Sequence, residues 1–170
     1  MKKEELEKII INILDSSTTM TLSCTLSDEP WVCSVFYARQ GFDLVFFSSR
    51  NSRHSKVFKE NRRAAASIYK DCDSWRDIRG LQIEGRVDIL TKIPAVAKGT
   101  VTYFRKYPFA REFFKAGSIL SDGLAGKMSA VALYVFRPSS IWYLNNLDGL
   151  GVRWKLDIRN GLAVDPPVQA

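Results

Sequence analysis

The chain has few side chains of the kinds that bind metals. Its 170 residues include three cysteines, Cys24, Cys33 and Cys72, and a single histidine, His54, with no Cys-x-x-Cys pair. A structural zinc site takes about four cysteine or histidine ligands at close spacing, so we expect no metal centre. A domain of this length buries roughly 70% of its unfolded surface and needs no disulfide to fold. We therefore expect reduced thiols and a cytoplasmic location.

Long hydrophobic runs are also missing. No stretch approaches the roughly 18 apolar residues that cross a bilayer, and the first residues continue into mixed charge rather than into a secretory signal. The sequence contains no Gly-x-Gly-x-x-Gly, no complete phosphate-binding P-loop around Gly126 and no Gly-x-Ser-x-Gly. These absences argue against a membrane protein, a Rossmann domain, a P-loop nucleotidase and a serine hydrolase.

The charge of the chain is positive and unevenly distributed. The formal net charge is +7, and residues 50–63 alone hold six lysines or arginines and one acid, a net of +5. The hydrophobic fraction of 46% and charged fraction of 25% are typical of a globular domain. A local excess of cations attracts phosphate groups, nucleic acid or an acidic surface.

Hydrophobic periodicity predicts one α+β domain over residues 1–170. Apolar residues at helical spacing indicate an amphipathic helix over residues 3–15, and the period then changes to two. Strands are expected at 20–26, 31–38, 42–49, 64–69, 81–89, 131–135, 141–144 and 152–158. A helical insert is expected at about 93–116, broken at Pro108, followed by a loop over 117–128, and residues 165–170 are expected to form a tail.

Successive strands with short turns favour a mainly antiparallel sheet with flanking helices, and closure into a small barrel would remove its edges. A turn centred on Asp28 and Glu29 would place Cys24 opposite Cys33, and we interpret both as core thiols. Trp75 and Trp142 are candidates to cover a flat ligand, although packing is the commoner role of such residues.

The most informative segment runs from Phe46 to Lys56. An apolar strand ends there, and hydroxyl and cationic side chains follow directly. Arginine offers a planar fork for two phosphate oxygens, and a helix that begins near Ser52 would add free backbone N–H groups. A solvated helix face is the alternative interpretation. We expect Asn61 and Arg62 to form a solvated turn after this helix.

This segment resembles the FMN-phosphate segment of the pyridoxamine 5′-phosphate oxidase-like split-barrel flavoproteins. The similarity rests on the strand at 42–49, on Ser-Arg-His-Ser-Lys at 52–56, on Glu-Asn at 60–61 and on Arg-Gly-Leu-Gln-Ile-Glu-Gly at 79–85. It covers roughly residues 9–90 and returns more weakly over residues 131–158. The resemblance implies a six-stranded split β-barrel, a homodimer, and FMN at the subunit interface.

The resemblance also implies site residues. The family's phosphate-binding Arg-Lys pair falls on Arg53 and His54, and Ser48 and Ser49 fall where the family contacts the flavin. We add Ser52 and Lys56 as phosphate ligands, because histidine in place of lysine weakens the phosphate site unless His54 is charged or Lys56 reaches it. Gln82 is a candidate for a flavin-contacting glutamine, although the alignment places that position nearer Gly80. No catalytic residue is assigned.

The end of the chain departs from the family's authentic oxidases. Residues 157–161 lack the arginine and histidine with which those enzymes hold pyridoxal phosphate, so the resemblance implies a different small-molecule substrate. The leading hypothesis is an FMN-dependent oxidoreductase. The alternatives are a non-catalytic flavin- or haem-binding protein, with the deazaflavin cofactor F420 or haem in place of FMN, and a basic nucleic-acid-binding barrel, which we regard as the weaker interpretation.

Overall fold

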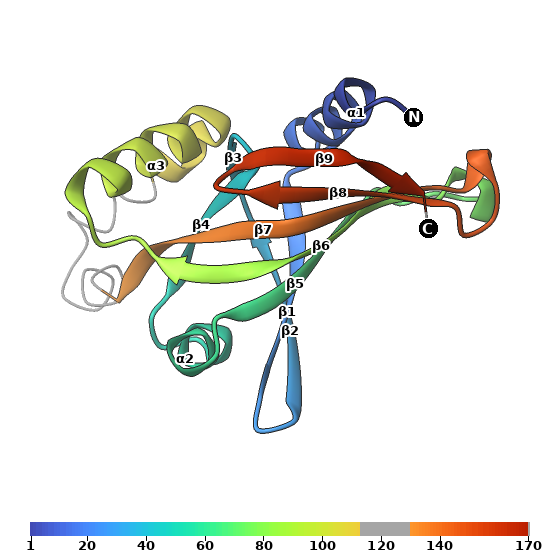
Figure 1. The fold of residues 1–170 in the computed structure, drawn as a ribbon. Helices are drawn as coiled ribbons and strands as arrows, with labels where there is room; N and C mark the ends of the chain where they lie inside the picture. The colour runs from blue at the N-terminus through green and yellow to red at the C-terminus, as the bar shows by residue number, and fades with distance from the viewer. Residues whose placement is uncertain (113–129, 170) are drawn as a thin grey trace.

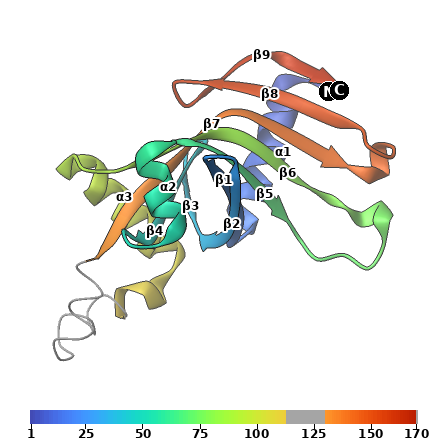
Figure 2. The ribbon, with the colours of Figure 1, turned by 90° about the horizontal axis from the view of Figure 1, so that it is seen from below.

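The structure is a computed structural model and describes residues 1–112 and 130–169. Its described strands form a single curled antiparallel sheet, with helices at its ends and side (Figures 1 and 2). The elements are α1 (Lys3–Ser16), β1 (Thr19–Leu26), β2 (Glu29–Phe36), β3 (Ala38–Gln40), β4 (Asp43–Ser49), α2 (Arg53–Glu60), β5 (Arg63–Tyr69), β6 (Arg79–Ile89), α3 (Ile93–Lys106), β7 (Val131–Asn145), β8 (Arg153–Arg159) and β9 (Leu162–Gln169). Short 3₁₀ turns lie at Trp75–Asp77 and Asn146–Asp148.

The sheet is a barrel that stays open along one side. The strand order is β2-β1-β5-β6-β7-β4-β3, and β8 and β9 continue from β7. In the described part of the chain no ladder joins β2 to β3 or β4, so β2 keeps a free edge. The inner face of the curl encloses the main core, and α3 packs a second core against β3, β4 and β7. The predicted α+β split-barrel class is confirmed.

Three expectations about the later strands need correction. The described strands number nine rather than the six that the resemblance implies. Seven of them match strands expected from periodicity, β8 at 152–158 among them, whereas β3 and β9 were not expected. The strands expected at 131–135 and 141–144 are one strand, β7, which passes Pro138 through a register shift opposite Glu84 and Gly85. The expected tail is strand β9, which tolerates two prolines because it pairs only with β8 and is an edge strand.

The predicted helices lie close to where they were expected. Helix α1 spans Lys3–Ser16, and α3 spans Ile93–Lys106. The break in the expected helical insert falls at Tyr107. A further helical segment begins at Pro108, where a proline suits the first turn of a helix. The rest of the expected helical insert and the loop at 117–128 lie outside the described residues.

The first hairpin is shifted from its expected register. Ser27 and Asp28 both have positive φ, 50° and 63°, which is the pattern of a two-residue hairpin turn. Leu26 therefore pairs with Glu29, and Cys24 lies opposite Trp31 rather than Cys33. The core-thiol interpretation holds, because Cys24 is buried in the main core and the half-buried Cys33 packs against it. This burial raises the pKa of Cys24 and raises the pKa of Cys33 to about 11.

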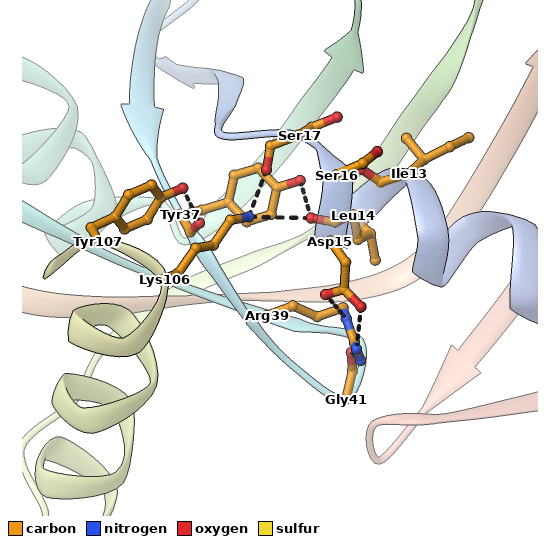
Figure 3. A network of polar contacts seen from close by, with 10 residues as sticks. All are labelled: Ile13, Leu14, Asp15, Ser16, Ser17, Tyr37, Arg39, Gly41, Lys106 and Tyr107. Carbon is orange, nitrogen blue, oxygen red and sulfur yellow. Dashed lines mark hydrogen bonds and ion pairs between the residues drawn. The ribbon is translucent and has the colours of Figure 1, made fainter.

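A lysine from α3 binds the carboxyl end of α1 (Figure 3). Lys106 Nζ donates to the carbonyl oxygens of Leu14, at 3.3 Å, and Ser17, at 2.6 Å, and lies 4.4 Å from the ring centroid of Tyr37. The Tyr37 hydroxyl also donates to the Leu14 carbonyl, at 2.8 Å. Helix α1 has no basic residue in its own last turn, so a residue distant in sequence supplies the cation that its free carbonyls favour.

We expect Lys106→Ala to lower the free energy of unfolding by about 2 kcal/mol, because a hydrogen bond to a charged group contributes roughly 1.5–3 kcal/mol. Urea unfolding measures this change. Lys98→Ala is the matched control, since Lys98 lies exposed on the same helix and the variant should lose less than about 0.5 kcal/mol. Equal losses in the two variants would show that the bonds to α1 contribute nothing.

Candidate functional site

The segment that begins α2 gathers three of the predicted site residues. Ser52 caps the helix, because its Oγ accepts a hydrogen bond from the Ser55 backbone N–H at 3.3 Å. His54 Nε2 lies 2.6 Å from Ser48 Oγ and 3.0 Å from Ser52 Oγ. Ser48, Ser52 and His54 therefore form one part-buried cluster between the end of β4 and the start of α2.

Burial decides the charge of His54. Desolvation lowers the pKa of His54 below its ordinary value of 6.5, so the imidazole is neutral at pH 7. Among the described residues, its hydrogen-bond partners are the two serine hydroxyls, and no carboxylate orients the ring. The arrangement lacks the third member of a hydrolytic triad, in agreement with the absence of a hydrolase motif.

Arg53 and Lys56 point away from this cluster, toward the β1–β2 hairpin. The Arg53 guanidinium forms an ion pair with Glu29 at 3.0 Å and lies 4.5 Å from the ring centroid of Trp31. A hollow of about 290 Å³ opens beside them, lined by Leu26, Ser27, Glu29, Arg53, Lys56 and Val57. Ser49 takes a third position, where its Oγ accepts from the Asn51 N–H in the turn before α2.

Gln82 lies on a different surface, the outer face of the curled sheet. Its side-chain oxygen accepts from Arg153 Nε at 3.2 Å, and its register partners are Ser67 on β5 and Trp142 on β7. The aligned position Gly80 cannot carry a side chain, since a Cβ there would collide with the Ile68 carbonyl oxygen and the Tyr69 ring. Gln82 is therefore the amide that reaches this face.

Gln82 borders a hollow with a volume of about 590 Å³, called here the outer hollow. Small side chains from β1 and β5 line much of it, and Val32 of β2, Trp142 of β7 and Arg153 of β8 complete its border. The complete lining is Thr21, Ser23, Val32, Ala65, Ala66, Ser67, Gln82, Ile83, Glu84, Trp142 and Arg153. The structure thus divides the predicted residues among the serine–histidine cluster, the hairpin cations and this outer hollow.

The structure adds residues that sequence reasoning missed. Glu29 and Trp31, both on β2, contact Arg53 of α2, and Arg153 on β8 contacts Gln82 of β6. No local motif marks them, because each contact joins segments more than 20 residues apart. Arg62, expected in a solvated turn, is exposed but pairs with Asp88 at 3.0 Å.

The described residues offer neither a metal-binding cluster nor a membrane-spanning helix. Over residues 1–112 and 130–169, no group of three or more His, Cys, Asp and Glu side chains is placed to hold a metal ion. None of the helices described is long and apolar enough to cross a bilayer.

A curled antiparallel sheet that is open on one side and capped by a short helix defines a split-barrel protein. No family model matches the chain. The chain is 25% identical over 145 residues to a UPF0306 protein of Haemophilus ducreyi, and the matched region covers 82% of this chain and 96% of that protein. It is 22% identical over 148 residues to a UPF0306 protein of Klebsiella pneumoniae, which covers 85% of this chain and 89% of that one.

Solved structures share the same fold. A putative pyridoxamine 5′-phosphate oxidase of Listeria innocua has a TM-score of 0.61 at 16% identity, covering 82% of this chain and 98% of that one. A FAD-binding protein of Mesorhizobium loti has a TM-score of 0.61 at 13% identity, covering 79% of this chain and 90% of that one. A haem-binding protein of Mycobacterium smegmatis has a TM-score of 0.65 at 16% identity; it covers 89% of this chain, which spans 56% of that one. The resemblance to pyridoxamine 5′-phosphate oxidase-like split barrels is confirmed for the fold.

The single histidine makes the burial of His54 testable. Because its folded pKa is lowered, the unfolded state binds more protons between the folded pKa and 6.5. The free energy of unfolding should therefore fall as the pH drops from about 7.5 through 6.5, and should level off below the folded pKa. His54→Gln should remove this component, so the wild-type-minus-variant difference isolates it.

NMR titration of the His54 ring protons gives the folded pKa directly, since no other histidine overlaps. A midpoint at or above 6.5 in the unliganded protein would contradict the desolvated cluster.

Proposed function

We propose that the protein binds a flavin, FMN, and uses it as an oxidoreductase acting on a small molecule. The observation that carries the proposal is the 590 Å³ outer hollow, with small side chains on its floor beside the Gln82–Arg153 pair. Solved split barrels with TM-scores above 0.6 include proteins named as FAD-binding, haem-binding and putative pyridoxamine phosphate oxidase, which supports a flat cofactor in general.

The hollow suits the ring of a flavin. Its volume lies within the roughly 300–1,000 Å³ of small-molecule sites. Outward-facing residues on β1 and β5, including Ser23, Ala65 and Ser67, leave a shallow floor for a planar ring. The amide of Gln82 and the guanidinium of Arg153 offer hydrogen bonds to the polar edge of such a ring, and Trp142 offers an aromatic wall. When bound, the flavin supplies the hydride chemistry.

Arg53 and Lys56 are the proposed phosphate ligands. Ser23 and Val32 of the β1–β2 hairpin line the outer hollow. Leu26 and Glu29, each three residues nearer the hairpin turn, line the 290 Å³ hollow beside Arg53. At about 3.3 Å per residue this is roughly 10 Å, the scale of the chain that joins a flavin ring to its phosphate. Because β2 is an edge strand, a ligand can pass around it from the outer face toward Arg53.

A buried donor beside Arg53 supports this placement. Trp31 Nε1 is buried and has no hydrogen-bond partner among the described residues, although buried indole N–H groups usually have one. A phosphate oxygen at Arg53 would bring an acceptor close to this indole. Ser48, Ser52 and His54 then act as positioning residues, because they hold the first turn of α2, from which Arg53 and Lys56 project.

The hollow favours flavin over haem. Haem iron in proteins is held by histidine, cysteine, methionine or tyrosine side chains. The side chains that line the described hollow include none of these four types. The haem alternative would therefore need an axial ligand from elsewhere, whereas a flavin needs only stacking and hydrogen bonds.

We also propose a homodimer. A ring on the outer face of a sheet has one side covered by the protein, and covering the other side would strengthen the electrostatic interactions in the site and limit side reactions with water. A second copy of the chain would supply that cover, and the 55% exposed Val32 at the rim offers it an apolar contact.

The phosphate assignment is tested by titrating the flavin-free protein with FMN. Arg53→Ala should weaken binding by about 10- to 150-fold, since a charge-assisted hydrogen bond contributes roughly 1.5–3 kcal/mol. Glu29→Gln should strengthen binding by up to about fivefold, because it removes a carboxylate that competes for Arg53 through an exposed pair of roughly 0.2–1 kcal/mol. Fluorescence quenching of FMN measures both constants.

Arg63→Ala is the control, since Arg63 is equally basic, exposed and in the same segment. If Arg53→Ala and Arg63→Ala weakened FMN binding equally, the phosphate assignment would be wrong. Absence of any FMN binding by the wild-type protein would refute the flavin proposal itself.

The dimer is tested by sedimentation equilibrium at micromolar concentration with FMN present. We expect about twice the chain mass of 19.3 kDa. Val32→Glu should shift the protein toward monomer and weaken FMN binding, whereas Val168→Glu, at a 60% exposed position on β9, should change neither. A wild-type monomer that binds FMN at full affinity would exclude a site completed by a partner.

A further inference from the structure

The basic segment 50–63 distributes its cations on two sides of α2. Arg53 and Lys56 face the β1–β2 hairpin, whereas Arg50, Lys59 and Arg62 border a separate cavity of about 440 Å³. Its lining comes from α2 and its flanking residues, from the carboxyl end of β6 and from Tyr134 of β7. The flavin proposal uses none of its lining residues.

Positive charge at this cavity is only partly paired among the described residues. In the described part of the chain, Arg50 and Lys59 form no ion pair. The one acidic residue of the lining, Asp88, lies 3.0 Å from Arg62 Nη1, and its other arginine partners are Arg86 and Arg137.

Asp88 is therefore already paired, and it forms no ion pair with Arg50 or Lys59. Burial raises the pKa of Asp88, but the bonds and charges of its three arginine partners outweigh burial and hold that pKa below the ordinary value. The Asp88 carboxylate is shared among three arginines, so the described lining, with Arg50, Lys59 and Arg62 against Asp88, keeps a net positive charge.

The remaining lining offers hydrogen bonds and an apolar wall. Ser55 and Thr91 contribute hydroxyl groups, and Phe58, Val87 and Ile89 join Tyr134 in the wall. Cations and hydroxyls in the lining of a cavity suit the oxygens of a phosphate group, and apolar lining residues suit the organic part of its ester.

We propose that this cavity is a second ligand site, which binds a phosphate monoester of about mononucleotide size. The ligand's phosphate contacts Arg50, Lys59 and Arg62, and its organic part lies against Phe58 and Tyr134. Because Ser55 lines the cavity while its Oγ lies 2.8 Å from Ser52 Oγ, the site adjoins the capping cluster of α2 without including it. The proposal does not depend on flavin binding.

The test uses adenosine 5′-monophosphate as the probe, with adenosine and inorganic pyrophosphate as comparison ligands, in calorimetric titrations. The wild-type protein should bind the monophosphate and pyrophosphate but not adenosine. The double variant Arg50→Gln/Lys59→Gln should lose at least about tenfold in affinity for the monophosphate, because it removes two charge-assisted contacts. Its FMN affinity should be unchanged, which separates this test from that of the flavin site.

The control is Arg63→Gln/Lys98→Gln, which removes the same charge from exposed positions outside the cavity. It should retain wild-type affinity for the monophosphate. Amide NMR shifts on adding the monophosphate should centre on Ser55, Thr91 and Arg62. Equal losses in the two double variants, binding of adenosine as tight as that of the monophosphate, shifts centred on Glu29 and Arg53, or no binding at millimolar ligand would each overturn the proposal.

Discussion

Strand β7 is the element on which both the outer hollow and the cavity beside α2 depend. It pairs with β4 and then with β6 and β8 along its 15 residues, so it holds together strands that are far apart in sequence. Tyr134 near its start borders the cavity beside α2, and Trp142 near its end borders the outer hollow. The register shift between these two residues lets one strand face an inner cavity with one half and an outer surface with the other. A Cβ at Gly85, opposite the shift, would collide with the Arg137 carbonyl, so the bend requires glycine there.

The electrostatic properties of α2 follow from which of its faces is covered. Ser55, Val57 and Phe58 are buried against the barrel, which leaves the basic residues of this short helix at its two exposed flanks. Arg53 and Lys56 fall on one flank and Lys59 on the other, with Arg50 and Arg62 at its ends. Helical periodicity thus separates a net charge that looks continuous in the sequence into two cationic surfaces.

The elements that could be predicted from the sequence are those set by local patterns. The first helix, strands β1, β2, β4, β5 and β6 and the hydroxyl-rich start of α2 all follow from periodicity and capping chemistry, whereas the three-residue β3 was not predicted. The register of the first hairpin could not be predicted so well, because alternation of period two leaves the turn uncertain by one residue. Pro138 and the Pro166–Pro167 pair argued locally against strands, and pairing with distant partners overrode that preference. Serine, arginine and lysine at 48–56 were visible as a motif, whereas Glu29, Asp88 and Arg153 become site residues only through tertiary contact.

The two cationic surfaces differ in how easily their ion pairs can be exchanged. Glu29 is 75% exposed and bonds a single guanidinium, so water can replace Arg53 at little cost and Arg53 is available for another anion. Asp88 is only 13% exposed and holds Arg62, Arg86 and Arg137 together. Separating it from them would leave a partly buried charge without partners, which is costly. Asp88 therefore acts as a fixed anchor that keeps Arg62 beside the cavity, whereas Glu29 acts as an exchangeable counter-ion. An anion arriving at the hairpin must displace the Glu29 carboxylate. One arriving beside α2 meets Arg50 and Lys59, which form no ion pair within residues 1–112 and 130–169.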